Sequence, residues 1–204
     1  MSLGRTPRRR THRRAAVPAA AVAAGVLALS ACGSGGTSGG SSGAGFVTGT
    51  GGIDTVAKSK RQDAPELEGE TLDGDRLSTA DYKGKILVIN VWGSWCTPCR
   101  AEAPYLAKVA EETEAKGVAF VGINTRNPEK GPALAFEKDF GVGYPSLYDP
   151  TGKQLLRFPK GSLNAQAIPS TIVIDRDGKI AARALFALNG EKLHKMIDPL
   201  IAEK

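Results

Sequence analysis

The chain has 204 residues, which suits one folded domain with extensions. Its net charge of +6 arises in the first 31 residues, which contain six arginines and no acidic residue. Without those six, the 27 basic residues fall to 21, equal to the 21 acidic residues. Nucleic-acid binding needs a basic patch on the folded domain, so composition gives no sign of a nucleic-acid partner.

Residues 1–31 have the three parts of a secretory signal. An arginine-rich start ends at Arg14, and the apolar stretch Ala15 to Leu29 is short for a membrane span. The following tetrapeptide, Leu29-Ser30-Ala31-Cys32, resembles the bacterial lipobox, in which the cysteine is lipidated and becomes the new N-terminus. An ordinary signal peptide and an uncleaved anchor are the alternatives. The general secretory and twin-arginine export routes both stay open.

Residues 32–62 are expected to hold the lipidated Cys32 and a flexible tether. Gly33 to about Gly52 is rich in Gly, Ser and Thr and has almost no apolar content, so it cannot bury enough surface to fold. A flexible stretch of roughly twenty residues has an end-to-end distance of about 25 Å. This length suits a domain held off a membrane surface, and the folded domain is expected over residues 63–204.

The expected elements of that domain alternate between strands and helices. Residues 86–92 are almost entirely apolar, which is typical of a central strand covered on both faces. Its one strongly polar member, Asn90, needs hydrogen-bond partners if it is buried. The pattern implies an α/β fold with a mixed sheet. The elements are a hairpin around Asp73-Gly74, strands at 86–92 and 118–123, helices at 97–116 and 133–140, short strands at 147–148 and 155–158, a hairpin over 171–187, and a helix over 193–201.

The segment Trp95-Cys96-Thr97-Pro98-Cys99 falls between the central strand and the first helix. At a helix start, unpaired N–H groups and the helix dipole stabilise a thiolate, the attacking species in disulfide exchange. Cys96 is therefore expected to be an exposed nucleophile with a lowered pKa, and Cys99 the resolving thiol. Thr97 and Pro98 are expected to tune the reduction potential.

Two other interpretations of the cysteine pair are half a zinc site and a structural disulfide. A structural zinc site needs four ligands, and the only histidines are His12, in the expected signal, and His194, far along the chain. A structural disulfide suits an oxidising compartment, but closing so short a loop removes little entropy from the unfolded chain. The pair is therefore predicted to be redox-active.

The segment from Trp92 to Cys99 resembles the active site of thioredoxin-fold proteins, and more closely that of the extracytoplasmic TlpA/ResA-like thiol–disulfide oxidoreductases. The resemblance covers about residues 63–203 and includes Lys83-Gly84-Lys85, Pro104 and Ile168-Pro169-Ser170-Thr171. It implies a thioredoxin-like fold, with a mixed central sheet flanked by helices and an N-terminal β-hairpin extension. No cofactor and no metal are expected.

The resemblance also assigns substrate contacts. The Ile168-Pro169 peptide is expected to be cis and to lie against the dithiol, with the backbone before Pro169 pairing with an extended substrate. Ile168 would then shape access to the site. Trp95 is expected to be a partly exposed platform beside Cys96, and Trp92 to lie in the core.

Two polar residues are expected to govern acid–base behaviour. Glu102 lies one helical turn beyond Cys99 on the same face, where the resemblance implies a proton acceptor for Cys99. A solvated glutamate near a helix start is the alternative. Asn90 occupies the position of the buried acid of thioredoxin and cannot titrate, which assigns proton transfer to Glu102. The alternative is that Asn90 only satisfies polar groups in the core.

Together these features predict a lipid-anchored, monomeric enzyme on the outer face of the bacterial cell membrane. It would reduce disulfides in exported Cys-containing proteins, such as apocytochrome c, and be recharged by a membrane thiol-electron donor. An oxidase that donates disulfides to secreted proteins is one rival. A peroxiredoxin is another, although it would need a peroxidatic cysteine outside Cys-x-x-Cys. A binding lipoprotein with a structural disulfide is the third.

Overall fold

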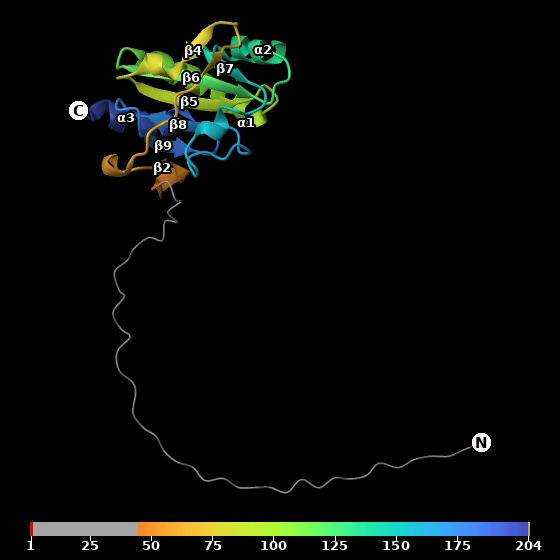
Figure 1. Ribbon diagram of the computed structural model, residues 1–204, viewed down its shortest axis with the longest axis horizontal. Coiled ribbons are helices and arrows are strands. Elements are labelled where there is room, and N and C mark those ends of the chain that lie inside the picture. Colours follow the sequence, from red (N-terminus) through yellow and green to blue (C-terminus); the bar gives the residue numbers. More distant parts are fainter. Residues whose placement is uncertain (2–44, 204) are drawn as a thin grey trace. The chain divides into compact units, whose positions relative to one another are not determined.

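The computed structural model describes residue 1 and residues 45–203 (Figure 1). The expected secretory signal, Cys32 and the first part of the expected tether lie outside these residues. In the part of the chain that is described, no helix combines the length and the apolar character needed to cross a membrane.

A seven-stranded mixed sheet forms the centre of the domain, in the order β1-β2-β9-β8-β5-β6-β7. β5, β6 and β7 are parallel, and every other neighbouring pair is antiparallel. Figure 1 shows β6, β5, β8, β9 and β2 following one another across the sheet. The expected mixed sheet is confirmed. The strands are β1 Val47–Thr48, β2 Asp54–Thr55, β5 Ile86–Trp92, β6 Val118–Thr125, β7 Ser146–Asp149, β8 Ser170–Ile174 and β9 Ile180–Ala184.

β5 lies inside the sheet because its side chains are apolar on both faces. All seven of its residues are buried. Successive side chains of a strand point to opposite faces, so Ile86 and Val88 join one buried cluster and Leu87, Ile89 and Val91 join another. The strand is thereby fixed between two layers, and its C-terminal end delivers the cysteine segment to a defined place.

Helices α1 (Thr97–Glu114) and α3 (Gly190–Ala202) cover one face of the sheet. Each presents an apolar stripe at helical spacing, as expected for a helix that packs on one side only. The buried residues of these stripes are Leu106, Val109, Leu193, Met196, Ile197 and Leu200. The third helix, α2 (Gly131–Phe140), follows β6 and packs beside the cysteines, where the Phe136 ring stacks on Trp92 with centroids 4.4 Å apart.

A small second sheet lies over the opposite face. β3 (Glu68–Glu70) and β4 (Arg76–Ser78) pair antiparallel across the Asp73-Gly74 turn, where a hairpin was expected. Leu67 and Leu77 are buried in the same cluster as the second set of β5 side chains.

Residues 155–158, expected as a short strand, instead begin with a 3₁₀ helix over Leu155–Arg157. The prediction was wrong because the Asp149 carboxylate, at the end of β7, accepts hydrogen bonds from the backbone N–H groups of Lys153 and Gln154, each at 2.8 Å. These bonds turn the chain into a helical conformation. Leu155 and Phe158 are still buried in the core.

The folded domain begins earlier than residue 63, so the expected extent of the tether was wrong. β2 pairs with β9, and Phe46, Ile53 and Val56 are buried. Arg61 makes ion pairs of 2.8 Å with Asp175 and 2.6 Å with Glu203. The glycine-rich tract contains Phe46 and is followed by Ile53, Val56 and Arg61, and these residues help to hold residues 45–62 on the domain.

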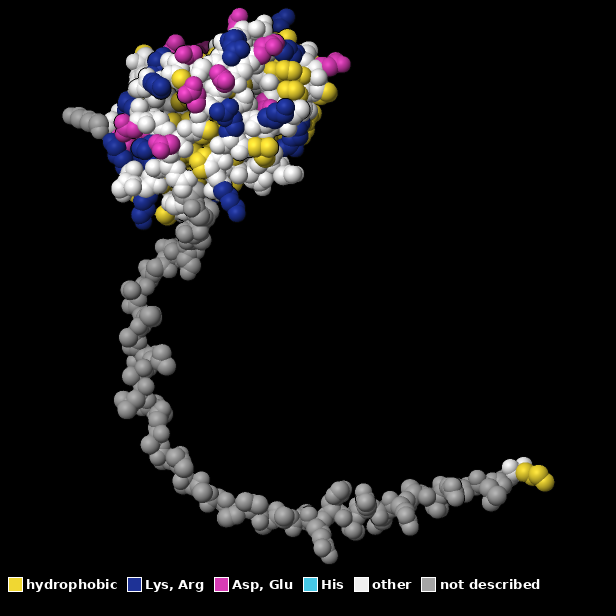
Figure 2. Space-filling view, viewed as in Figure 1, with side chains coloured by type: hydrophobic (Ala, Val, Ile, Leu, Met, Phe, Trp, Pro, Cys, Tyr) yellow, Lys and Arg dark blue, Asp and Glu magenta, His cyan; other side chains and the backbone are white. Residues whose placement is uncertain are grey.

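Charges on the domain surface are mixed in sign. Figure 2 shows Lys and Arg side chains interspersed with Asp and Glu over the visible face of the folded domain. This agrees with the equal numbers of basic and acidic residues that follow the first 31 residues.

Candidate active site

The two cysteines lie where β5 ends and α1 begins. They form a disulfide, with an S–S distance of 2.06 Å and their Cα atoms 5.2 Å apart. Cys96 is the N-cap of α1, and its Sγ accepts a hydrogen bond from the backbone N–H of Cys99 at 3.2 Å. The expected helix start is thus confirmed, with an N–H donor aimed at the Cys96 sulfur. Thr97 and Pro98 form the exposed first turn of the helix.

Cys96 is buried, which contradicts the expectation of an exposed nucleophile. Its exposed fraction is 3% and that of Cys99 is 1%. Both pack in a cluster with Leu72, from the β3–β4 connection, and with Phe136 and Ile168. The helix position alone predicted exposure, whereas neighbours distant in the sequence cover the sulfur in this oxidised form. The two tryptophans agree with expectation: Trp92 is 3% exposed and Trp95 is 52% exposed.

Glu102, which follows Cys99 by three residues on α1, is buried and held by two donors. Asn90 Nδ2 donates to Glu102 Oε1 at 2.8 Å, and the backbone N–H of Leu188 donates to Oε2 at 2.9 Å. Asn90 is itself buried and also donates to Thr171 Oγ1 at 3.2 Å. Burial raises the pKa of Glu102 to about 7, against the lowering effect of the Leu188 and Asn90 hydrogen bonds. The carboxyl group therefore changes charge near neutral pH.

The Ile168–Pro169 peptide bond is cis, as expected. β8 starts at the next residue, Ser170, which pairs with Val91 near the end of β5. Ile168 packs in the same cluster as both cysteines. The sheet register therefore brings the Ile168–Pro169 segment to the dithiol, although about seventy residues separate them in the sequence.

The loop after β6 supports the cysteine segment, and the sequence analysis missed its role. Asn127 Oδ1 accepts hydrogen bonds from the Ser94 N–H and from Asn124 Nδ2, both at 3.0 Å. Its Nδ2 donates to Ser94 Oγ at 2.6 Å. β6 is the parallel neighbour of β5, so the loops at their C-terminal ends lie at one edge of the sheet. The two asparagines at the end of a buried strand, Asn124 within it and Asn127 just after it, were the available signal.

Arg126, in the same loop, was also missed. Its carbonyl accepts a hydrogen bond from Trp95 Nε1 at 3.0 Å, and its guanidinium carbon lies 5.4 Å from the centre of the Trp95 ring. Gly93 makes this arrangement possible, because a Cβ atom there would lie 2.8 Å from Trp95 Nε1. The exposed Trp95 platform is therefore fixed in place by the β6 loop.

A second carboxyl group with a raised pKa is Glu137 of α2, which shares the hydrogen-bond partner Ser146 with Trp92. Burial raises the pKa of Glu137 to about 7; a hydrogen bond with Ser146 lowers it and the charge of Asp73 raises it further. Ser146 Oγ also accepts a hydrogen bond from Trp92 Nε1 at 3.2 Å. Gly122 is required beside this pair, since a Cβ atom there would lie 2.1 Å from Ser146 Oγ.

Across the described residues, no group of three or more His, Cys, Asp or Glu side chains is arranged to hold a metal ion. The site holds the two cysteine sulfurs and, in Glu102, a carboxyl group with a raised pKa. A disulfide at a strand-to-helix junction, a cis proline brought to it by the sheet register and a buried carboxyl three residues further along the helix define the site of a thioredoxin-fold thiol–disulfide oxidoreductase.

Known proteins agree with that class. The Redoxin family model matches residues 59–196, and the chain belongs to this family. It is 31% identical over 136 residues to the thiol–disulfide oxidoreductase ResA of Bacillus subtilis, covering 67% of this chain and 73% of ResA.

Two solved structures extend the agreement to the fold. A DsbF homologue from Corynebacterium diphtheriae is 40% identical, with a TM-score of 0.68, over 74% of this chain and 96% of that one. A secreted thiol–disulfide isomerase from Corynebacterium glutamicum is 31% identical, with a TM-score of 0.70, over 74% of this chain and 92% of that one. The thioredoxin-like fold and the assignment as a thiol–disulfide oxidoreductase are confirmed.

Proposed function

We propose that this oxidoreductase is tethered to the outer face of the bacterial cell membrane and reduces disulfides in exported proteins, with apocytochrome c as one example. One observation carries the chemistry: Cys96 caps α1 with its sulfur, and Cys99 follows one turn on, with a buried carboxyl group at Glu102. This arrangement provides an attacking sulfur, a resolving sulfur and a proton acceptor in one place.

The reaction starts from the reduced dithiol. The Cys96 thiolate attacks one sulfur of the substrate disulfide; the other leaves as a thiolate and takes a proton from solvent. The Cys99 thiolate then attacks Cys96 Sγ, forms the Cys96–Cys99 disulfide and expels the second substrate sulfur, which is also protonated. Two electrons pass in total from the protein dithiol to the substrate disulfide, and the two protons that the substrate thiolates take up balance the two that Cys96 and Cys99 release.

Glu102 is the proposed acceptor of the Cys99 proton. The two residues share a face of α1, and a pKa of about 7 leaves a substantial fraction of the carboxyl ionised at neutral pH. Asn90 and Cys99 line the same small hollow, and Asn90 donates its hydrogen bond to Glu102. Asn90 therefore has the proposed role of holding the carboxylate rather than titrating.

The proposed substrate lies extended beside the cis proline. Its backbone would pair with the chain before Pro169, while Trp95 provides an exposed flat surface next to Cys96 in the sequence. Since Cys96 is covered in the oxidised form, Ile168 is the proposed residue that governs access to it.

The proposed location rests on the sequence before residue 45 and on the relatives. The tetrapeptide ending at Cys32 would supply a lipid anchor, and a membrane thiol-electron donor would return electrons to the disulfide. The Corynebacterium glutamicum relative is described as secreted, which supports a site outside the cytoplasm. Substitution Cys32→Ala in the native host should move the protein from the membrane fraction to the soluble extracytoplasmic fraction; unchanged membrane association would reject the anchor.

Substrate trapping tests the proposed function directly. Expressed in its native host, the Cys99→Ser variant should hold exported cysteine-containing proteins through Cys96 as mixed disulfides that dithiothreitol releases. The matched control is the double variant lacking both sulfurs, which should trap none. If Cys99→Ser captured no exported protein, reduction of exported substrates would be rejected.

A second function, donation or isomerisation of disulfides, is favoured by the description of the Corynebacterium glutamicum relative as an isomerase. The reduction potential separates the two directions. A value near −270 mV, as for thioredoxin, supports a reductant, whereas a value near −120 mV, as for DsbA, supports an oxidant. Equilibration with glutathione or dithiothreitol buffers measures it.

A further inference from the structure

Arg126 has an uncommon backbone conformation beside the dithiol. It is the residue directly after β6, and its φ of +55° lies in the left-handed region, which non-glycine residues seldom adopt. Strained conformations persist where surrounding contacts hold them, and they concentrate at functional sites. Here Trp95 Nε1 donates to the Arg126 carbonyl at 3.0 Å.

The side chain of Arg126 joins three segments of the active site. Its Nη2 donates to the carbonyls of Ala165 at 2.9 Å and Gln166 at 3.3 Å, in the loop that leads to the cis proline. The same guanidinium group lies over the Trp95 ring. The β6 loop, the cysteine segment and the cis-proline loop therefore meet at one exposed cation.

A second guanidinium group, that of Arg100, lies against the same segment. Arg100 Nη1 donates to the carbonyl of Ser94 at 3.5 Å, and its guanidinium carbon lies 4.9 Å from the centre of the Phe140 ring. Ser94 and Trp95 immediately precede Cys96. Arg100 thus contacts Ser94 and Arg126 contacts Trp95, the two residues that come directly before the attacking Cys96.

Neither cation is neutralised. In the described part of the chain, Arg61, Arg76 and Arg183 form ion pairs with carboxylates, whereas Arg100 and Arg126 have none within 4.0 Å. The neighbouring lysine of the β6 loop, Lys130, pairs with Glu70. Glu129, in the same loop, forms no ion pair among the described residues. The rim of the dithiol therefore presents two unpaired guanidinium groups held on aromatic rings.

We propose that Arg126 and Arg100 select substrates that carry acidic side chains next to the reacting cysteine. A guanidinium group binds a carboxylate through two parallel N–H donors, and its stacking on an aromatic ring orders it before the substrate arrives. Positive charge at the rim also speeds the approach of acidic segments and opposes basic ones. The inference deepens the proposed function and rests on it, because it names the substrate class of the same site.

The test uses three disulfide peptides that differ only in the residues flanking the cysteine: aspartate, lysine or serine. The full chain should show a kcat/KM about tenfold higher for the aspartate peptide than for the lysine peptide at low salt. The preference should shrink in about 0.5 M salt, where the screening length falls to about 4 Å. A wild-type ratio near one would overturn the proposal.

Variants assign the preference to these side chains. Arg126→Asn, which tolerates the left-handed backbone, and Arg100→Gln should each lower the ratio, and together they should bring it close to one. Arg126→Lys should retain part of it, because charge remains but the two-donor geometry is lost. The serine peptide measures any loss shared by all substrates. If the double variant lost rate equally on all three peptides, the arginines would only position the loops, and selection would be rejected.

Lys108→Gln is the matched control, since it removes an exposed positive charge further along the same helix as Arg100. It should leave the aspartate-to-lysine ratio unchanged, and an equal fall there would assign the effect to net charge. Failure of the proposed function would appear differently: no peptide would be reduced faster by the wild type than by Cys96→Ser.

Discussion

The arginines near the two ends of β5 differ in whether they bind carboxylates. At the start of the strand, Arg61 binds Asp175 and Glu203 together and joins the N-terminal segment, the β8–β9 turn and the end of α3. At the end of the strand, Arg100 and Arg126 bind no carboxylate in the described part of the chain, and Arg126 has a strained backbone. The paired Arg61 at one end stabilises the fold, whereas the two arginines at the other end remain available to bind a carboxylate of a partner.

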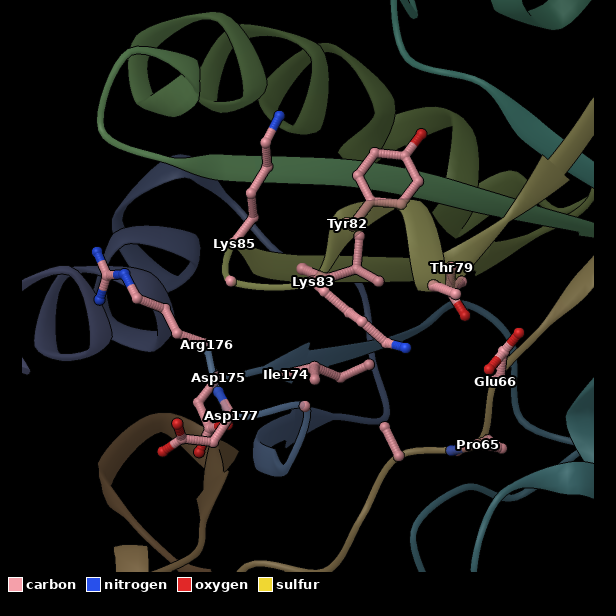
Figure 3. Close-up of a pocket in the computed structure, with 15 residues that line it drawn as sticks. Pro65, Glu66, Thr79, Tyr82, Lys83, Lys85, Ile174, Asp175, Arg176 and Asp177 are labelled. Carbon is pink, nitrogen blue, oxygen red and sulfur yellow. Dashed lines mark hydrogen bonds between the residues drawn. The ribbon is translucent and has the colours of Figure 1, made fainter.

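The two ends of β5 also differ in the cavities beside them. A cavity of about 410 Å³ lies at the start of β5, with Leu87, Ile174 and Tyr82 among its walls (Figure 3). Two of the charged residues in its wall already have partners: Asp175 accepts from Arg61, and Arg176, which points away from the other labelled side chains, donates to the Leu200 carbonyl at 2.7 Å. At the other end of β5, Cys99 and Asn90 line a smaller hollow.

Removing the attacking sulfur should have the largest effect. Cys96→Ser should lower kcat/KM for a disulfide peptide by at least about a thousandfold, because serine cannot form the mixed disulfide. Measuring insulin or peptide reduction with dithiothreitol as electron source checks it. A variant that retained a tenth of the activity would show that the site at this end of β5 is not the reacting one.

Removing the paired cation at the other end should affect stability rather than turnover. Arg61→Met leaves the buried Asp175 without its cation and should lower the free energy of unfolding by about 3 kcal/mol. Urea unfolding measures this change. Arg76→Met, which removes an exposed pair with Glu68, is the matched control and should change little. If Arg61→Met lowered kcat/KM at a temperature where the variant is folded, the claim that this end of β5 contributes only to stability would be contradicted.

Glu102 should make stability fall as pH rises. Its pKa is about 7 in the folded protein against 4.5 for the ordinary side chain, so the folded form binds the proton more tightly. The stabilisation from that proton is fully present below pH 4.5 and is lost as pH rises through 7, about 3 kcal/mol in total. Unfolding free energies at pH 4.5 and 8 should show a smaller decline in Glu102→Gln. If the unfolding free energy of Glu102→Gln fell as much as that of the wild type between these pH values, Glu102 would be ionised throughout.

Glu137 provides a matched comparison, because it has the same raised pKa without a place in the proposed proton transfer. Glu102→Gln should lower the rate at pH 7 by at least about tenfold and abolish the inflection near pH 7 in the rate profile. Glu137→Gln should flatten the stability profile but keep that inflection. Rate profiles that lost the inflection equally in both variants would contradict the assignment of Glu102.

The smallest effect is expected at the α3 surface. The hydrogen bond to Asp198, and then that to Glu112, raise the pKa of His194. Its contribution to stability is therefore present below pH 6.5 and is lost as pH rises through the folded-state pKa. His194→Ala should cost a few tenths of a kcal/mol at pH 5.5 and less at pH 8.5. The reaction rate should not change, because His194 lies far along the chain from Cys96 and Cys99.

Much of the fold was predictable because it follows from local patterns. The apolar run of β5, the helix that follows Cys96 and the buried Asn90 each depend on neighbours in the sequence or on strand burial. The burial of Cys96 was not predictable, because Leu72 and Ile168 reach it from distant parts of the chain. Arg126 was missed for the same reason: its partners lie in two other loops.

Alkylation of the reduced protein tests the central claim most directly. Cys96, whose Sγ accepts the backbone N–H of Cys99 at the start of α1, is the proposed attacking thiolate, and Cys99 is the proposed resolving thiol. Limiting iodoacetamide at pH 6 to 8, followed by mass spectrometry of the peptides, should show Cys96 modified first by a wide margin. Equal modification of the two cysteines, or earlier modification of Cys99, would contradict the account.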